Sequence, residues 1–209
     1  MTKTSRKLIT AISVLLISTL SVKSQVYNDN DETLGLSYEQ NLLTPVVPDK
    51  ASAQVVRHMD NIGKTLTKHD FEVKKARKGE VLDIVMPVSI LFTPGDTILR
   101  SAALPVLRAF DALIRRPELY KVIIVAHTDN TGDELYSKRL SIARAKSVER
   151  FLESLVSGIK TNIISYGLGY DKALVPNNSI VNRARNRRID IYIVPGVALV
   201  DLARKGKLS

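Results

Sequence analysis

Residues 122–152 read VIIVAHTDNTGDELYSKRLSIARAKSVERFL, and this stretch decides how the fold is interpreted. Residues 120–126, YKVIIVA, are almost all apolar and predict a central strand covered on both faces. A polar loop, TDNTGDE, follows, and Asp133 is suited to cap the helix that comes next. A strand, a loop and a long helix in this order favour an α/β fold.

Arg144 stands out because a helical projection places it on the apolar side of the predicted helix. At about 100° per residue, Arg144 falls between Leu140 and Val148. The same side also carries Phe151 and Leu155, and the opposite side carries Lys146, Glu149, Arg150 and Glu153. A buried guanidinium needs hydrogen-bond acceptors, because burying it without them is costly. Arg144 therefore predicts a partner inside the protein or the mouth of a pocket.

Asp129 offers such a partner. It follows the predicted strand, at the carboxyl edge where ligands bind in α/β folds. An acid and an arginine that face one pocket can hold a zwitterionic amino-acid headgroup, with Arg144 on the carboxylate and Asp129 on the ammonium. Spacing alone favours a simpler alternative, an internal ion pair between Asp129 and Arg144 that joins the loop to the helix. On these residues alone, both alternatives stay open.

The rest of the chain alternates strand and helix patterns. Residues 79–92 predict a strand or hairpin that ends at Phe92, and residues 101–116 predict a helix. Residues 161–169 and 187–195 predict two further strands. The buried face of the helix is expected to contain Leu104, Leu107, Phe110, Leu113 and Ile114. This alternation indicates an α/β fold, a compact α+β sandwich.

The N-terminus has the pattern of a secretory signal peptide over residues 1–24. Basic residues precede the apolar run of residues 8–20, which is shorter than the about 20 residues that a membrane span needs. Cleavage is expected before Gln25 and would remove four basic residues and no acid, which lowers the net charge of +10 accordingly. The alternative is an uncleaved membrane anchor.

Four further segments complete the predicted organisation. Residues 25–50 are expected to form a flexible tether, because they contain prolines and show no sustained period. Residues 51–69 predict an amphipathic helix that packs on the domain or on a partner. Its apolar face contains Val55, Met59, Ile62 and Leu66. The folded domain is expected over residues 70–196, and residues 197–209 are expected to form a basic C-terminal tail.

Metal and nucleic-acid sites are disfavoured by the residues present. The chain has no cysteine, which excludes thiolate metal sites and a lipid-modified cysteine. His127 is near Asp129, but no cluster has metal-ligand spacing, so we expect no metal and a structural hydrogen bond instead. The arginine-rich run of residues 183–188 lacks interleaved aromatics, which disfavours nucleic acid as a partner. Within it, Asn186 and Arg187 are expected to brace the pocket floor.

Catalysis is disfavoured for similar reasons. Ser141 has no evident base, and the absence of cysteine removes a thiol nucleophile. A glycosidase needs two carboxylates across a cleft, and only Asp129 stands out near the predicted pocket. We therefore expect a binding module without enzyme activity, catalytic residues or cofactors.

Five motifs in order resemble one known family. They are MPVSILFTPGD from Met86, AHTDNTG from Ala126, RLSIARAKSV from Arg139, GLGYDKALVP from Gly167 and NRARNRRIDIYIV from Asn182. Over residues 80–195 the chain resembles the OmpA-like domain, also called the OmpA/MotB C-terminal domain. This is the non-covalent peptidoglycan-binding module of Gram-negative envelopes. The resemblance implies a βαβαβ-type domain with a mixed sheet and helices packed on it.

The resemblance also implies which residues bind. In the family, the diaminopimelate headgroup of the stem peptide is held by an Asp after the second strand and an Arg in the next helix. These positions match Asp129 and Arg144. Further contacts are implied for Thr128, Leu140 and, in the loop after the first strand, Phe92 and Thr93.

Two positions depart from the family pattern. Ala126 stands where the family usually has Gly, a small change beside the strand end. Ser137 stands where the family usually has Asn, and its shorter side chain weakens one implied contact with the ligand.

The expected function is non-covalent binding of peptidoglycan, which links the envelope to the cell wall from the periplasm, with an outer-membrane or other envelope protein as a partner. One alternative is a stator-like inner-membrane protein with an uncleaved anchor, but the apolar run of residues 8–20 has no acid for a proton channel. Another alternative is an enzyme that modifies the wall.

Overall fold

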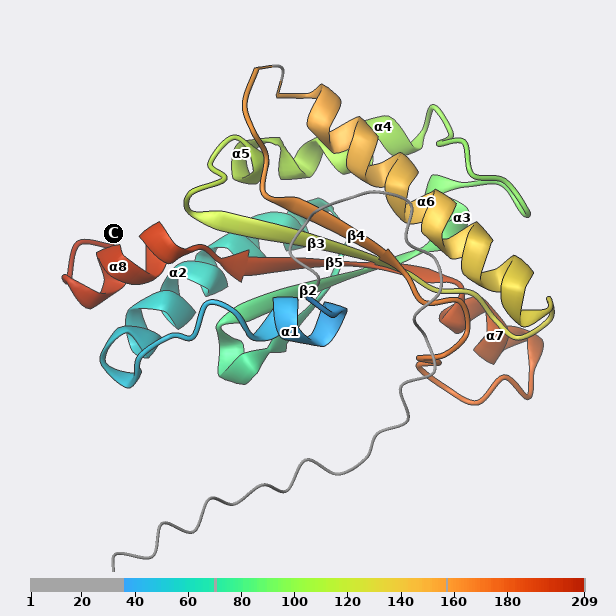
Figure 1. The fold of residues 1–209 in the computed structure, drawn as a ribbon, viewed down its shortest axis with the longest axis horizontal. Helices are drawn as coiled ribbons and strands as arrows, with labels where there is room; N and C mark the ends of the chain where they lie inside the picture. The colour runs from blue at the N-terminus through green and yellow to red at the C-terminus, as the bar shows by residue number, and fades with distance from the viewer. Residues whose placement is uncertain (1–35, 70, 157, 209) are drawn as a thin grey trace, which may run out of the picture. The chain divides into compact units, whose positions relative to one another are not determined.

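The computed structural model describes residues 36–208, apart from residues 70 and 157. The predicted signal peptide and the first part of the predicted tether lie outside the described residues. The described chain forms a five-stranded sheet in the order β1-β2-β5-β3-β4 (Figure 1). Its strands are β1 (Glu72–Ala76), β2 (Val81–Pro87), β3 (Tyr120–Ala126), β4 (Ile163–Gly167) and β5 (Arg188–Pro195).

The sheet is mixed, as expected. β3 and β4 are parallel, whereas the β1–β2, β2–β5 and β5–β3 pairs are antiparallel. Every residue of β3 and β5 is buried. The prediction of a central strand from this nearly continuous apolar run is therefore confirmed. This arrangement brings the end of β3 beside the start of β5, where His127 N donates to the Arg188 carbonyl at 2.9 Å.

The main core lies between one face of the sheet and a layer of helices. Side chains from α2 (Asp49–Leu66), α4 (Ala103–Leu107), α5 (Asp111–Ile114), α6 (Glu134–Ser154) and α8 (Val197–Arg204) join one buried apolar cluster with the sheet. In Figure 1, α6 and the α4–α5 segment lie on the same side of the sheet. The other face is covered in part by α1 (Tyr38–Leu43), whose Tyr38 and Leu42 pack on a second, smaller cluster.

Helix α6 lies close against β4, and a glycine permits this approach. A Cβ atom on Gly167 would lie 2.1 Å from the backbone nitrogen of Ile142, so any larger residue would push the helix away. Asp133 caps α6 as predicted, since its side chain accepts a hydrogen bond from Tyr136 N at 2.8 Å. This contact positions the first half of α6 beside the end of β3.

The buried face of α6 differs in part from the prediction. Arg144 and Val148 are buried as expected, but Leu140, Phe151 and Leu155 are only half-buried. Glu149, expected on the solvent side, is buried and accepts a hydrogen bond from Ser165 Oγ at 2.5 Å. Its Oε2 also lies 3.0 Å from Lys146 Nζ. The helix is rotated toward its polar side because β4 supplies a hydrogen-bond donor there.

Two predicted elements end or break earlier than expected. The strand expected to reach Phe92 ends at Pro87, because proline cannot donate to the sheet ladder, and α3 (Val88–Leu91) follows. The helix expected over residues 101–116 is divided into α4, a 3-10 turn η3 (Arg108–Phe110) and α5. Leu104 is half-buried rather than buried, and Ala103 takes a buried position instead.

The predicted tether and tail also differ from the structure within the described residues. Residues 36–50 contain α1 and the start of α2, so this part of the predicted tether is helical. Helix α2 packs in the main core through Ala51, Val55 and Met59. The predicted tail begins with α8, whose Leu199 and Ala203 are buried. Both helices bury apolar side chains that lie at helical spacing, which the predictions of a tether and a tail did not use.

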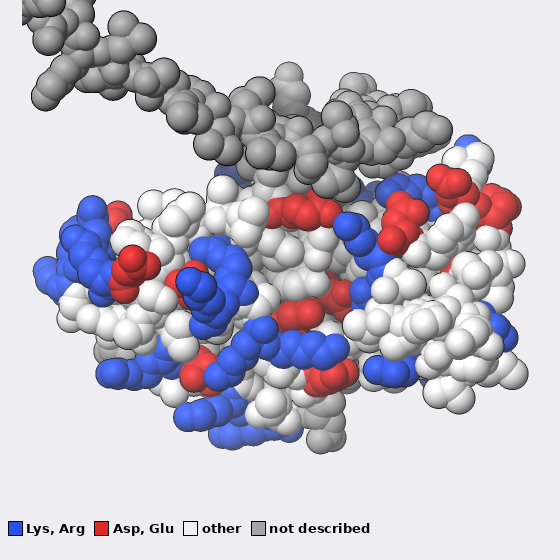
Figure 2. Space-filling model, turned by 90° about the horizontal axis from the view of Figure 1, so that it is seen from below, with Lys and Arg blue, Asp and Glu red and all other residues white. Residues whose placement is uncertain are grey.

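Three short segments remain, namely η1 (Thr67–His69), η2 (Arg77–Gly79) and α7 (Ile180–Asn186). Figure 2 shows Lys and Arg side chains spread widely over one face of the molecule, with Asp and Glu between them. The positive charge of the chain is therefore not confined to one element. None of the helices in the described residues is long and apolar enough to cross a membrane.

Candidate functional site

Asp129 lies three residues beyond β3 and is almost fully buried, with 5% of its surface exposed. Its Oδ1 accepts hydrogen bonds from Thr131 N at 3.0 Å and from Thr131 Oγ1 at 2.5 Å. Its Oδ2 pairs with Arg187 Nη1. Burial alone would raise the pKa of Asp129, but the bonds from Thr131 and Arg187 outweigh it and lower that pKa. The Asp129 side chain is therefore an ionised carboxylate at neutral pH, and Thr131 and Arg187 hold it in place.

Arg144 lies on the buried face of α6 with 3% of its surface exposed. Its Nε donates to the Asp96 carbonyl at 2.8 Å, and its Cζ lies 5.4 Å from the centre of the Phe92 ring. Burial lowers the pKa of Arg144 from its usual high value, which leaves the guanidinium charged. Nη1 and Nη2 have no hydrogen-bond partner among the described residues. Both nitrogens are thus available to an acceptor from outside the chain.

No ion pair joins Asp129 to Arg144 in the described part of the chain, so the alternative of an internal bridge between them is wrong. Asp129 pairs instead with Arg187, which precedes β5. The pairing follows from the sheet, because the end of β3 and the start of β5 are neighbours. Arg187 was expected to brace the pocket floor, and its contact with Asp129 was not predicted. Its side chain remains 42% exposed, so it also faces solvent.

The turn after α3 holds Arg144 from the other side. Asp96 Oδ1 accepts hydrogen bonds from Thr97 N at 2.6 Å and Ile98 N at 2.9 Å, and Thr93 Oγ1 donates to Asp96 Oδ2 at 3.2 Å. The backbone bonds from Ile98 and Thr97 are the main cause of the lowered pKa of Asp96. This network fixes the turn with the Asp96 carbonyl directed at Arg144. Sequence reasoning missed Asp96, although an Asp after TPG is a turn signal.

The remaining predicted residues are placed at different depths. Phe92 is 1% exposed and lies beneath the Arg144 guanidinium, whereas Thr93 is exposed. Ser137 is buried, and Leu140 is half-buried. Thr128 is 6% exposed, and its Oγ1 has no hydrogen-bond partner among the described residues.

Asn186 supports a loop rather than the charged pair. It is fully buried, and its Oδ1 accepts from Leu174 N at 2.9 Å and Val175 N at 3.1 Å. Its Nδ2 donates to the Val175 carbonyl and to Asn177 Oδ1, both at 2.8 Å. One amide thereby holds residues 174–177 against the end of α7, next to Arg187.

His127 lies in a buried pair with Asp190. It is 2% exposed, its Nε2 lies 3.1 Å from Asp190 Oδ2, and burial lowers its pKa. The described residues contain no group of three or more His, Cys, Asp or Glu side chains that could hold a metal ion.

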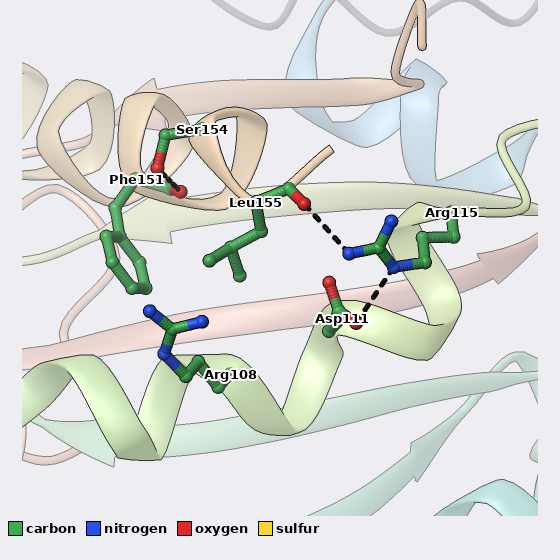
Figure 3. A pocket seen from close by; sticks show the side chains of 6 residues that line it. All are labelled: Arg108, Asp111, Arg115, Phe151, Ser154 and Leu155. Atoms are coloured by element: carbon green, nitrogen blue, oxygen red, sulfur yellow. Dashed lines mark hydrogen bonds and ion pairs between the residues drawn. The ribbon is translucent and has the colours of Figure 1, made fainter. Parts of the chain in front are cut away.

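A separate cavity of about 400 Å³ lies at the opposite end of α6. Figure 3 shows Arg115 donating to Asp111 and to the Leu155 carbonyl, each at 2.9 Å. The lining also includes Arg108, Phe151 and Ser154. None of the predicted binding residues lines this cavity, so it is distinct from the site around Asp129 and Arg144.

Comparison with known proteins shows which family this arrangement is similar to. The OmpA family model matches residues 91–187. Outer membrane protein A from Bordetella avium is 41% identical over 81 residues, which is 38% of this chain and 41% of that protein. The outer-membrane lipoprotein YfiB from Pseudomonas aeruginosa is 40% identical over 77 residues, 36% of this chain and 45% of YfiB. The chain therefore spans less than half the length of these two relatives.

Solved structures agree on the fold. A putative MotB-like protein from Desulfovibrio vulgaris superposes with a TM-score of 0.60 at 24% identity, covering 70% of this chain and 93% of that one. The cell wall anchor of the T6SS from Pseudomonas aeruginosa superposes with a TM-score of 0.53 at 22% identity, covering 68% and 96%. The motifs around Asp129 and Arg144 fall inside residues 91–187, the segment that the OmpA family model matches.

Proposed function

We propose that this protein binds peptidoglycan non-covalently through the diaminopimelate headgroup of the stem peptide. In this proposal Arg144 grips the headgroup carboxylate and Asp129 receives its ammonium. The bound domain links the cell envelope to the wall on the periplasmic side. The protein acts as a binding module and not as an enzyme.

The observation that carries the proposal is the Arg144 guanidinium. It is buried, it is stacked on Phe92, and Nη1 and Nη2 have no partner in the described residues. A buried charge that is only partly satisfied is costly unless a ligand completes its hydrogen bonds. A carboxylate matches this demand, because it accepts two parallel bonds from a guanidinium.

Arg187 has a defined part in this proposal. Together with the hydrogen bonds from Thr131, its ion pair with Asp129 keeps that carboxylate ionised despite its burial. Arg187 Nε and Nη2 have no partner in the described residues, and its side chain is 42% exposed. The incoming ammonium shares Asp129 with Arg187.

The relatives support an envelope role. Matched proteins include an outer membrane protein A and an outer-membrane lipoprotein. One protein with the same fold is the cell wall anchor of the T6SS from Pseudomonas aeruginosa. An outer-membrane or other envelope protein is the kind of partner that this role requires, and the periplasm is its compartment.

Binding to purified sacculi and to stem peptides tests the proposal. Calorimetry should show binding of a diaminopimelate-containing tripeptide and clearly weaker binding of its lysine counterpart, which lacks the side-chain carboxylate. Arg144→Ala and Asp129→Ala should each reduce affinity by at least about 30-fold, because breaking a desolvated charge contact costs about 2–5 kcal/mol.

Arg139→Ala provides the matched control, because Arg139 lies on the same helix, is exposed and has no partner among the described residues. It should bind like the wild type. Thermal melts must show that the Asp129 and Arg144 variants stay folded. Wild-type binding by both folded variants, or equal affinity for the two peptides, would refute the assignment.

A further inference from the structure

The exposed face of α2 carries a row of three cations. Lys50, Arg57 and Lys64 are spaced seven residues apart, so on a helix they fall within about 40° of one another. All three residues are exposed. The buried face of the helix, which contains Val55 and Met59, lies on the opposite side. The row therefore points away from the domain, over a length of about 21 Å.

The chain that follows α8 adds two cations beside this row. A Cβ atom on Gly206 would lie 4.0 Å from Nε2 of Gln54, so the end of α8 meets α2 at that residue. Gln54 lies between the first two cations of the row, at the spacing of helical neighbours from each. Lys205 and Lys207 flank Gly206, and both are exposed. We call these five cations together the basic surface: Lys50, Arg57, Lys64, Lys205 and Lys207.

The basic surface is not neutralised by the described part of the chain. None of its five side chains forms a hydrogen bond or an ion pair with another described residue. Two acids of α2 and α8 pair with cations outside the surface, since Asp60 lies 2.7 Å from Lys75 and Asp201 lies 3.1 Å from Arg204. In these two helices only Asp49 remains outside such a pair. The surface therefore stays strongly positive.

The shape and composition of the basic surface favour a flat anionic partner. The outward face of a helix is convex, so it meets a plane and does not enclose a strand. Four of the five cations are lysines, whose compact charges stand on flexible stems, whereas arginine is the residue that grips one phosphate or carboxylate with two bonds. Helix α2 contains no Phe, Tyr or Trp, which disfavours the stacking that single-stranded nucleic acid requires.

The basic surface lies at the other end of the sheet from Asp129 and Arg144. β5 begins at Arg188, next to the pair of Asp129 and Arg187, and ends at Pro195, after which α8 follows. A strand of eight residues separates its two ends by about 23 Å. In Figure 1, α2 and α8 lie at one end of the sheet and α7 lies at the other. Ligands at the two places would therefore not exclude each other.

We propose that the basic surface docks on a membrane of anionic phospholipid. The partner is the plane of phosphate headgroups of a bilayer that contains a lipid such as phosphatidylglycerol. Each Lys or Arg close to such a plane strengthens binding about 5-fold. Docking uses α2 and the end of α8 and does not depend on Asp129 or Arg144, so it goes beyond the proposed function and can fail separately from it.

A fluorescent label in the row of cations measures its approach to a membrane. The chain contains no cysteine, so Asn61→Cys gives the full chain one attachment site on the exposed face of α2. Vesicles of phosphatidylglycerol and phosphatidylcholine in about equal parts, with a quencher on some headgroups, should quench the label at low salt. About 1 M salt should abolish the quenching, because the Debye length falls to about 3 Å. Vesicles of phosphatidylcholine with the same quencher should quench it far less.

A triple variant tests the surface itself. Lys50→Gln, Lys64→Gln and Lys207→Gln together should raise the lipid concentration needed for half-maximal quenching by about 100-fold, because each lost charge costs about 5-fold. Calorimetry with the diaminopimelate tripeptide should give this variant the affinity of the wild type. That measurement separates a failure of the membrane surface from a failure of the headgroup site.

The matched control removes the same amount of charge from another part of the domain. Arg139→Gln, Arg150→Gln and Lys160→Gln change three exposed cations on α6 and in the chain that follows it. Helix α6 packs on β4 at one edge of the sheet, whereas Gly63 of α2 packs on Leu82 of β2. The control should raise the half-maximal lipid concentration by less than about 3-fold, because charges beyond a Debye length from the membrane are screened. Thermal melts check that both triple variants are folded.

Four results would overturn the docking surface. Equal losses in the two triple variants would show that net charge alone attracts the protein to the vesicles. Quenching that persists in about 1 M salt would show that the contact is not electrostatic. Equal quenching by neutral and anionic vesicles would show that the headgroup charge has no part. An anisotropy of the label that rises with polyglutamate, without quenching by anionic vesicles, would identify an acidic protein as the partner instead.

Discussion

One face of the sheet is covered by helices through apolar contacts, whereas the opposite face buries charged side chains near α1. On the first face, Leu82, Ile84, Val122, Ile124 and Ile191 pack against the main helices in one continuous cluster. Such a core is stabilised by burial of apolar surface and tolerates no cavities. We expect this face to carry most of the stability of the fold.

The second face contains a small apolar cluster and several buried polar groups. Lys121 is 7% exposed and donates to the Asn41 and Thr44 carbonyls, each at 2.5 Å. Arg77 donates to the Leu42 and Pro45 carbonyls at 3.0 and 2.8 Å. Two cations thus hold the backbone of residues 41–45, whose Leu43 side chain is 60% exposed. These polar bonds position the segment, in addition to the packing of Tyr38 and Leu42 on the smaller apolar cluster.

The two faces of the sheet have different roles in the domain. The helical face holds the sheet and α6 rigid, which keeps Asp129 and Arg144 in register. The second face secures the entering chain with bonds that are specific but individually modest, since a hydrogen bond to a charged group contributes about 1.5–3 kcal/mol. Local opening should therefore begin on the second face.

The largest effect is expected on the helical face. Phe110→Ala should lower the free energy of unfolding by about 3–5 kcal/mol, because Phe110 is fully buried and its removal leaves a cavity. Denaturant unfolding followed by circular dichroism measures the change. Val46→Ala, at a side chain of the α1–α2 connection that is 76% exposed, should change it by less than about 0.5 kcal/mol. Similar losses in the two variants would contradict the contrast between the faces.

Lys121→Met should act locally on the second face. Without the ammonium, the Asn41 and Thr44 carbonyls lose their buried donor, at a cost of about 1–3 kcal/mol. Amide hydrogen exchange over residues 38–44 should accelerate by about 10-fold or more, while β3 stays protected. Lys64→Met, at an exposed lysine of α2, serves as the control. Unchanged exchange over residues 38–44 would show that α1 is held by other contacts.

The smallest effect concerns Asp83, which faces Tyr192 across the second face. Burial, followed by the charge of Asp190, raises the pKa of Asp83 to about 7. A carboxyl whose folded pKa lies above its unfolded value stabilises the protein below the unfolded pKa. That stability is lost as pH rises through about 7. Asp83→Asn should thus be more stable than the wild type at pH 8, by about 1–2 kcal/mol.

Thermal melts between pH 4 and pH 8 measure this difference. The melting temperature of Asp83→Asn should depend less steeply on pH than that of the wild type. Asp201→Asn, at a carboxylate that is 47% exposed, should follow the wild-type curve. Parallel curves for Asp83→Asn and the wild type would show that Asp83 is not the group that titrates.

Local sequence patterns predicted the elements that carry the fold. The apolar run of β3, the alternation in β5 and the helix of α6 all appear in the structure with small shifts in their ends. The same patterns placed Arg144 on a buried helix face and Asp129 at a strand end. Periodicity succeeds here because it reports which side of an element is apolar, and that property belongs to neighbouring residues.

The prediction failed where short segments fold by contact with the rest of the domain. Residues 36–50 and 197–204 contain helices that were not predicted, since helices this short gain stability mainly when their apolar side chains pack on the domain. Pro87 ended β2 early for a local reason that could have been read from the residue itself.

The class of fold, the family resemblance and the two charged residues of the candidate site can be inferred from the amino-acid sequence alone. How those charges are held depends on the folded chain, in which Arg144 donates a hydrogen bond to the Asp96 carbonyl, 48 residues away, and Asp129 pairs with Arg187, 58 residues away. Contacts at such separations depend on strand order and on which chain ends meet at the sheet edge. Local periodicity contains no information on that order, because it describes one element at a time.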